Sequence, residues 1–186
     1  MAHFNTIVNT KEQIMLHAAH RNGSSRILRI PNVNKDWKLI RPAFMHRSNC
    51  EKFTHVKVIR DPYLRWRSWF YDFKAGPTNP NWTNKWSLDY AKLWVDEFKD
   101  TMHQDIHTNF QKVEYDDARI LQNEIFLQME DLDIFLGISQ KPHVIDARTT
   151  YEQQMDADVI SYLQIKIPFL YNIDYTWMQN LPLWSK

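Results

Sequence analysis

Two loops of this chain carry residues whose types and spacing suit phosphate binding. One lies in HVKVIRDPYLRWRSWFYDF, residues 55–73, where Arg60 stands between a β-branched stretch and an amphipathic helix. Asp61 is the expected N-cap of that helix and Pro62 its first residue. Ser68 lies about two helical turns further on. A guanidinium at the strand end and a hydroxyl on the helix can therefore hold one phosphate from two sides.

The same segment also fits an ordinary strand and helix whose arginine lies at the surface. In that interpretation the aromatic residues of the helix form a buried stripe of Tyr63, Trp66, Phe70 and Phe73. Aromatic residues at helical spacing usually pack into a core. A second phosphate-binding loop is therefore needed to favour the functional interpretation.

The second loop, HRNGSSR at residues 20–26, has the composition of an anion-binding turn. Its glycine permits a tight turn, and the N–H groups that open the following helix point at an anion together with two serine hydroxyls. The residues predicted to bind phosphate here are Arg21, Asn22, Gly23, Ser24, Ser25 and Arg26. The loop is not a Walker A motif, which requires G-x-x-x-x-G-K-[ST]. Taken alone, it is also compatible with a plain helix cap.

Strands and helices are expected to alternate along the chain. Short apolar stretches predict strands at 13–17, 38–41, 56–59 and 125–128. Capping residues and Pro/Gly positions predict helices over 24–30, 62–73, 88–102, 129–136 and from 156 onward. This alternation is typical of an α/β fold with a mostly parallel sheet flanked by helices. Ligands of such sheets bind beyond the carboxyl ends of the strands, where both loops would lie.

Length, charge and composition narrow the function further. The 186 residues suit one domain, 1–186, with one core. With 23 basic and 22 acidic residues the net charge is +1, so no global field favours nucleic acid or an anionic membrane. The single cysteine, Cys50, excludes an internal disulfide and a cysteine-based metal cluster. No signal-peptide core or run of about 18 apolar residues is present, so we expect a soluble, cytoplasmic chain.

The two loops together resemble those of the sulfotransferases that use 3′-phosphoadenosine-5′-phosphosulfate (PAPS). In that family a [K/R]-x-G-[S/T]-[S/T] loop binds the 5′-phosphosulfate, and an arginine and a serine at the spacing of Arg60 and Ser68 bind the 3′-phosphate. The segment RNGSS, residues 21–25, matches the first motif. VIRDPYLR, residues 58–65, is similar to the strand end of heparan sulfate and uronyl 2-O-sulfotransferases. The resemblance implies a P-loop-like three-layer fold.

The resemblance also implies how the phosphates are held. Arg21 with Ser24 and Ser25 would bind the 5′-phosphate and offset the charge on the bridging oxygen. Arg60 with Ser68 would bind the 3′-phosphate. The donor would be PAPS and the product 3′-phosphoadenosine-5′-phosphate (PAP), and the family requires no metal. The 2-O-sulfotransferases usually carry lysine where this chain has Arg21, whereas Golgi sulfotransferases that act on other sugar positions and on tyrosine use arginine there.

A base and an acceptor site are implied in the same way. RPAFMHRS, residues 41–48, resembles the stretch with the catalytic histidine, so His46 is the expected base, although Ser48 replaces a second histidine of the relatives. DIHTNFQ resembles a segment of carbohydrate sulfotransferases, which makes His107 and Gln111 candidate acceptor-binding residues; a solvated helix face is the alternative. The free tryptophans of a Pro/Asn-rich loop, Trp82 and Trp86, are candidates for stacking on sugar rings.

Three functions from different classes follow. The first is transfer of a sulfuryl group from PAPS to a hydroxyl, with a glycan as the expected acceptor. The second is a nucleotide-dependent phosphoryl transferase on a related P-loop-like fold, against which the missing Walker lysine counts. The third is a non-catalytic nucleotide binder, which the serine at position 48 leaves open.

Overall fold

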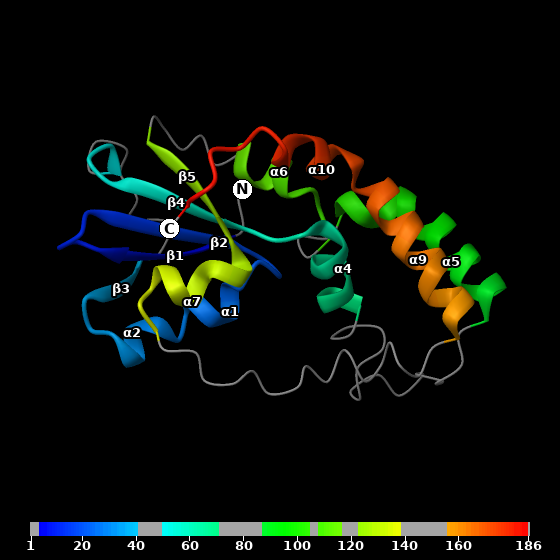
Figure 1. Ribbon diagram of the computed structural model, residues 1–186, viewed down its shortest axis with the longest axis horizontal. Coiled ribbons are helices and arrows are strands. Elements are labelled where there is room, and N and C mark those ends of the chain that lie inside the picture. The colour runs from blue at the N-terminus through cyan, green and yellow to red at the C-terminus, as the bar shows by residue number, and fades with distance from the viewer. Residues whose placement is uncertain are drawn as a thin grey trace. The chain divides into compact units, whose positions relative to one another are not determined.

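The chain forms two compact units, each assembled from segments that are distant in the sequence (Figure 1). A computed structural model describes residues 4–40, 50–70, 87–104, 108–116, 123–138 and 156–185. The sheet unit comprises Met1–Arg60, Gln111–Ile138 and Trp177–Lys186, and the helical unit comprises Asp61–Phe110 and Ser139–Thr176. One sulfotransferase-like domain over residues 1–186 stays a prediction.

The described residues of the sheet unit contain a mixed sheet in the order β3-β1-β2-β4-β5. Its strands are β1 Phe4–Asn9, β2 Ile14–Ala19, β3 Trp37–Ile40, β4 Thr54–Ile59 and β5 Glu124–Gln128. β2 pairs with β4 and β4 with β5 in parallel, whereas β1 is antiparallel to both β2 and β3. The α/β class with helices beside a sheet is therefore confirmed. The expectation of a mostly parallel sheet is wrong, and the P-loop-like arrangement stays a prediction.

The antiparallel part of the sheet arises from a hairpin that we did not predict. Between β1 and β2 the chain reverses in four residues, 10–13, and so short a connection can join only antiparallel strands. The side-chain Oδ1 of Asn9 accepts hydrogen bonds from the N–H groups of Lys11 and Glu12, both at 3.1 Å, and Gln13 has a φ of 55°. An asparagine that closes such a turn, after the β-branched run TIV, was the signal available in the sequence.

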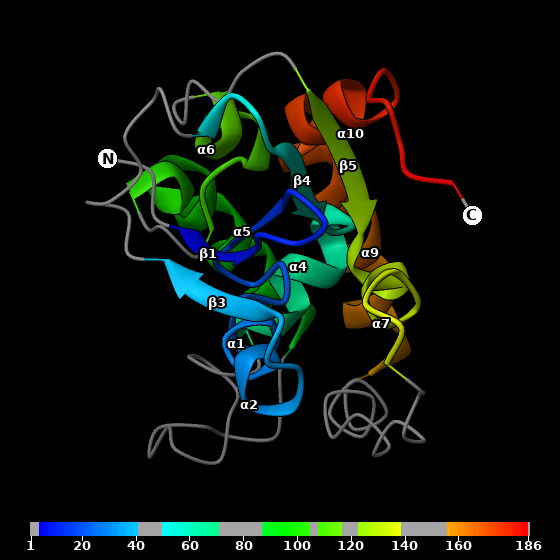
Figure 2. The ribbon, with the colours of Figure 1, turned by 90° about the vertical axis from the view of Figure 1, so that its left-hand side faces the viewer.

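Helices cover both faces of the sheet (Figures 1 and 2). They are α1 Ser24–Ile27, α2 Ile30–Val33, α6 Gln111–Asp116, the 3₁₀ turn η4 Met129–Asp131 and α7 Leu132–Phe135. α1, α2 and α7 lie on one face, over a core of Ile7, Leu16, Ala18, Ile27, Ile30, Trp37, Val56, Val58, Leu127 and Leu132. α6 lies on the other face, over Ala19, Ile59, Tyr115 and Phe126.

The single helix predicted over 24–30 is in fact two short ones, α1 and α2. Pro31 has no N–H to donate to the carbonyl of Ile27, so a helix that began at Ser24 cannot continue through it. Proline is tolerated in a first turn, and a new helix accordingly begins at Ile30.

The C-terminal segment lies along the outer edge of β5. The N–H of Phe126 donates to the carbonyl of Pro182 at 3.0 Å, and the N–H of Trp184 donates to the carbonyl of Phe126 at 2.8 Å. These bonds occupy the main chain of an otherwise open strand edge.

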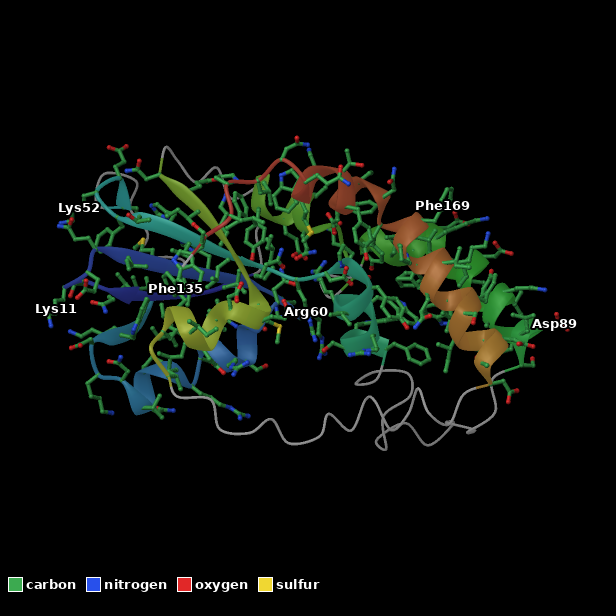
Figure 3. All side chains as sticks on the ribbon, in the orientation of Figure 1. Lys11, Lys52, Arg60, Asp89, Phe135 and Phe169 are labelled. Carbon is green, nitrogen blue, oxygen red and sulfur yellow. The ribbon has the colours of Figure 1, made fainter. Side chains whose placement is uncertain are left out.

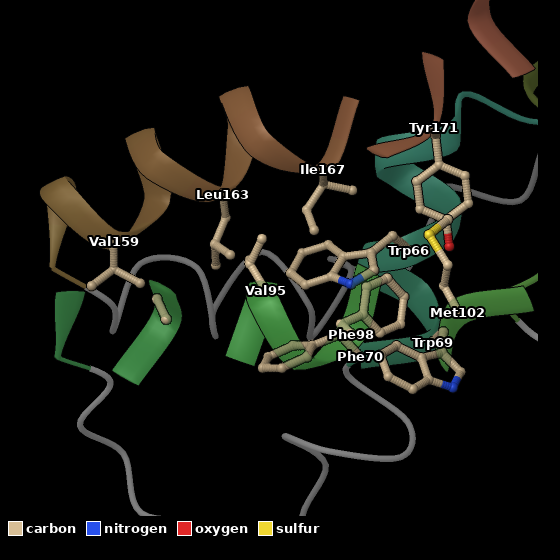
Figure 4. Close-up of a cluster of buried hydrophobic side chains, with 11 residues drawn as sticks. Trp66, Trp69, Phe70, Val95, Phe98, Met102, Val159, Leu163, Ile167 and Tyr171 are labelled. Atoms are coloured by element: carbon tan, nitrogen blue, oxygen red, sulfur yellow. The ribbon is translucent and has the colours of Figure 1, made fainter. Parts of the chain in front are cut away.

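The helical unit is built around aromatic side chains. Its elements are α4 Pro62–Phe70, α5 Leu88–Thr101, the 3₁₀ turn η3 Met102–Gln104, α9 Ala157–Leu170 and α10 Asn172–Met178, whose last two residues belong to the sheet unit. The aromatic cluster comprises Trp66, Trp69, Phe70, Ala91, Val95, Phe98, Met102, Val159, Leu163, Ile167 and Tyr171 (Figure 4). No helix within the described residues is long and apolar enough to cross a membrane.

Two helix starts lie where the sequence predicts them. Asp61 Oδ1 accepts the N–H of Leu64 at 2.9 Å, and α4 begins at Pro62. Ser87 Oγ accepts the N–H of Tyr90 at 3.1 Å at the start of α5. These are local interactions of a cap with its own first turn, and the residue types alone specify them.

Candidate functional site

The loop between β2 and α1 has a backbone that only a few residue types accept. Gly23 has a φ of 82° and Arg21 a φ of 67°. Positive φ is routine for glycine but uncommon for arginine and costs about 1–2 kcal/mol. A Cβ at Gly23 would lie 3.6 Å from side-chain atoms of Leu132 and Met129, which is ordinary contact. Conformation, and not lack of space, therefore selects glycine here.

The helix after this loop contributes less to anion binding than the sequence suggests. α1 has four residues, so its dipole is far smaller than that of the longer helix we predicted. Its first turn closes on Gly23, whose carbonyl accepts the N–H groups of Arg26 at 2.8 Å and Ile27 at 3.0 Å. Ser24 is buried and Ser25 is exposed. The cationic side chains must then supply most of the attraction for a phosphate.

Arg60 brings one such side chain to this loop. It follows the last residue of β4, is 7% exposed, and its Nη1 donates to the carbonyl of Arg21 at 3.3 Å (Figure 3). β2 and β4 are parallel neighbours with Ala18 opposite Val58, so their carboxyl ends meet at one edge of the sheet. The guanidinium of Arg60 therefore lies at the main chain of Arg21, in the loop after β2.

Gln111, the first residue of α6, is hydrogen-bonded both to the loop after β2 and to the end of β4. Its Oε1 accepts the N–H of Arg60 at 3.0 Å and the Nδ2 of Asn22 at 2.6 Å, while its Nε2 donates to the carbonyl of Arg60 at 2.8 Å. Asn22 Nδ2 also donates to the carbonyl of Val58 at 3.1 Å. Gln111 and Asn22 are both completely buried. The sequence predicts Gln111 as an acceptor-binding residue. Its hydrogen bonds to Asn22 and to Arg60 were not predicted.

Tyr115 makes a second connection one turn along the same helix. Its hydroxyl donates to the carbonyl of Val58 and accepts the N–H of Ala19 at 3.2 Å. Residues 111 and 115 lie on one helix face because they are four apart. The carboxyl ends of β2 and β4 are thus held by polar side chains of one short helix. The Gln/Tyr pair at this spacing was the only sequence signal for the arrangement.

Arg26 has an ion-pair partner in the sheet unit. Its Nη2 contacts Asp133 Oδ2 of α7, and 34% of the Arg26 side chain remains exposed. Phosphate binding by Arg26 stays a prediction.

Ser68 lies in the helical unit, where it is buried on α4. Its pairing with Arg60 around one phosphate rests on the sequence alone. Several other predicted residues lie outside the described residues: His46, Trp82, Trp86 and His107. Within the described residues no group of three histidine, cysteine or carboxylate side chains is placed to share a metal ion.

Two histidines form a buried chain of hydrogen bonds on the α6 face of the sheet. Thr6 Oγ1 bonds to His17 Nδ1 at 2.9 Å, His17 Nε2 to His55 Nδ1 at 3.0 Å, and His55 Nε2 to the carbonyl of Cys50 at 3.0 Å. A carbonyl can only accept, so His55 Nε2 carries a proton. His55 Nδ1 then accepts from His17 Nε2, and His17 Nδ1 accepts from the Thr6 hydroxyl. Both rings are neutral in this arrangement.

The surroundings keep both imidazoles neutral. Burial, followed by the neighbouring His55 and Lys57, lowers the pKa of His17 to about 3. Burial also lowers the pKa of His55. Lys57 itself is buried and pairs with Glu124 Oε1 at 2.7 Å. With 0% and 2% of their surface exposed, His17 and His55 serve the core and do not reach a substrate.

The site thus consists of a strained glycine-containing loop and two arginines, joined at the carboxyl ends of parallel strands by buried amides. Comparisons of the chain with protein-family models, with curated proteins and with solved structures gave no match.

Proposed function

We propose that this chain is a sulfotransferase that moves a sulfuryl group from PAPS to an acceptor hydroxyl, with a carbohydrate as the expected acceptor. The observation that supports the proposal most is the hydrogen bond from Arg60 Nη1 to the carbonyl of Arg21. It places two arginines from segments 39 residues apart at one edge of the sheet. An isolated surface arginine, the simpler interpretation of the motif, would not be 7% exposed and directed at the other loop.

The donor has phosphate groups on both the 5′ and the 3′ positions of one adenosine. Such a nucleotide needs two cationic sites a short distance apart, and the contact of the Arg60 guanidinium with the Arg21 main chain brings the two arginine-bearing segments together. The positive φ values at Arg21 and Gly23 support the same interpretation, because strained backbone persists where the surrounding structure holds it and often marks a ligand site. Ser24 and Ser25 follow directly and supply hydroxyl donors.

To catalyse sulfuryl transfer, a protein must mainly position the acceptor hydroxyl in line with the sulfur and stabilise the charge on the leaving phosphate. In the proposed reaction the acceptor oxygen bonds to sulfur while the bond from sulfur to the bridging oxygen breaks, and PAP leaves with that electron pair. Arg21 holds the 5′-phosphate and offsets the developing negative charge. Arg21 remains protonated throughout, because a guanidinium has a pKa above about 12. His46 is the residue expected to take the acceptor proton.

Calorimetric titration with PAP tests the proposal. Arg60→Ala removes a charge-assisted contact worth about 1.5–3 kcal/mol, so we expect the Kd for PAP to rise by about 10- to 100-fold. The matched control is Arg29→Ala, an exposed arginine that makes the same change in charge. We expect this control to leave the Kd within about twofold. Equal Kd values for the wild type and Arg60→Ala would contradict the proposal.

Two further measurements separate the alternatives. Thermal stabilisation by ATP with Mg²⁺, and none by PAP, would replace the sulfotransferase with a phosphoryl transferase. Transfer of labelled sulfate from PAPS to a glycan panel tests catalysis, with His46→Ala as the variant expected to lose it. Tight PAP binding with no transfer to any acceptor would favour the non-catalytic binder.

A further inference from the structure

The side chain of Gln111 is bonded to the main chain of Arg60 as a neighbouring strand would be. Its Oε1 accepts the Arg60 N–H and its Nε2 donates to the Arg60 carbonyl, at 3.0 and 2.8 Å. Both polar groups of one residue's main chain are thereby fixed by one amide. The φ and ψ of Arg60 set the direction in which its guanidinium leaves the backbone, so this pair of bonds fixes where the cation can reach.

The same amide also contacts the loop between β2 and α1, residues 20–26. Gln111 Oε1 accepts the Nδ2 of Asn22 at 2.6 Å, and Asn22 stands between the two residues of positive φ, Arg21 and Gly23. A second N–H of the Asn22 amide donates to the carbonyl of Val58, two residues before Arg60. One chain of hydrogen bonds therefore runs from the loop after β2, through two buried amides, to the end of β4.

The orientation of the Asn22 amide is unambiguous. Reversing it would bring its oxygen against two other acceptors, the Val58 carbonyl and Gln111 Oε1. Among the described residues, Asn22 Oδ1 is a buried oxygen with no hydrogen-bond partner. The Asn22 amide thus leaves its own oxygen unsatisfied while its nitrogen links the loop after β2 to the end of β4. Such an arrangement fixes geometry at the expense of stability.

We infer that Gln111 is a positioning residue that couples the two arginine-bearing segments, so that the two phosphates of one nucleotide are held as a pair. This inference rests on the proposed function. Once one phosphate is bound, the second binds at an effective concentration set by how well the two sites are aligned. Gln111 therefore increases the preference for the 3′,5′-bisphosphate over a monophosphate, and it does so without touching the ligand.

The test is a ratio of two dissociation constants, that of adenosine 5′-phosphate divided by that of PAP, measured by calorimetry. We expect this ratio to be about 100 or more in the wild type, because two charged contacts act together. Gln111→Met fills the same space but removes every hydrogen bond of the amide. In this variant we expect the ratio to fall about tenfold. If Gln111 had a purely structural role, the variant would raise the dissociation constants of both ligands by the same factor and leave their ratio unchanged.

Thr6→Val is the matched control. Thr6 is completely buried in the same unit and its hydroxyl bonds to His17, away from both loops. We expect it to lower the melting temperature and to keep the ratio. Asn22→Ala removes the hydrogen bond between Asn22 and Gln111 from the Asn22 side, and it replaces Gln111→Met if that variant does not fold. We expect Asn22→Ala also to lower the ratio.

The outcomes distinguish the two claims. A wild-type ratio near one, or no binding of PAP, overturns the proposed function and this inference with it. A large wild-type ratio that both Gln111→Met and Asn22→Ala preserve overturns the inference alone. A large ratio that falls in these variants, and not in Thr6→Val, supports it.

Discussion

The aromatic cluster of the helical unit and the polar edge of the sheet unit are held by different kinds of interaction. In the cluster, rings contact rings, as between Trp69 and Phe98 with centroids 5.4 Å apart. At the edge, amides and a hydroxyl make directed bonds to main-chain atoms, as Gln111 and Tyr115 do. Apolar packing depends on area and volume, whereas a hydrogen bond also depends on angle. The first region therefore secures stability, and the second secures the placement of Arg60.

The largest expected effect would break the cluster. Phe98 is 6% exposed and contacts Trp69 and Trp94, so Phe98→Ala leaves a cavity and should lower the free energy of unfolding by about 3–5 kcal/mol. Urea unfolding followed by tryptophan fluorescence measures it. Leu93→Ala, on the exposed side of the same helix, is the control and should change stability by about 0.5 kcal/mol or less. Equal shifts for both variants would contradict a packed cluster.

The second-largest expected effect is the pH dependence of stability that arises from the buried histidines on the α6 face of the sheet. The pKa of His17 is about 3 when folded and near 6.5 when unfolded, so the unfolded chain takes up the proton first as the pH falls. The stability from this group is complete above pH 6.5 and decreases by about 1.4 kcal/mol per pH unit from there toward pH 3. At pH 5 the loss from His17 amounts to about 2 kcal/mol.

Unfolding midpoints between pH 8 and pH 5 measure this dependence. His17→Gln removes the titrating group, and its stability should fall less steeply over that range than the stability of the wild type. Parallel pH profiles for the two proteins would rule out a neutral buried His17.

A pair of glycines separates stability from function. Gly23 and Gly137 have φ values of 82° and 64°, and a Cβ at either has room. Each substitution by alanine should therefore destabilise by a similar amount, about 1 kcal/mol, from backbone strain. Only Gly23→Ala should also weaken PAP binding, because only Gly23 lies in the loop of residues 20–26, beside Arg21. Equal PAP affinity in the two variants, measured by calorimetry, would mean that this loop does not bind the nucleotide.

The smallest expected effect is at the ion pair between Arg26 and Asp133. The Arg26 side chain is one-third exposed, and partly solvated pairs contribute about 1 kcal/mol or less, so Arg26→Gln should have little effect on the urea midpoint. A Kd for PAP that rises tenfold in this variant would establish Arg26 as a phosphate ligand. An unchanged Kd would show that its pairing with Asp133 is its whole role.

Sequence-based prediction succeeded where the interacting residues are close together in the sequence and failed where they are far apart. The cap at Asp61, the helix start at Pro62 and the cap at Ser87 were predictable because each involves a residue and its own first turn. The end of a helix before Pro31 is equally local, but the single helix predicted over 24–30 was wrong, because α1 ends at Ile27 and α2 begins at Ile30. Strand β1 was missed because its pairing partners are set by a hairpin and by β3, which lies about thirty residues away.

The sequence by itself determined which side chains stand at the ends of β2 and β4, because strand, turn and cap signals are carried by neighbouring residues. Only the tertiary structure decided that Arg60 contacts the Arg21 carbonyl and that Gln111 joins both segments. Gln111 is 51 residues from Arg60 and 89 from Asn22, and no periodic pattern spans such distances. The parallel register of β2 and β4 brings Asn22 and Arg60 to one edge of the sheet, because it places both carboxyl ends there, and α6 brings Gln111 to the same edge.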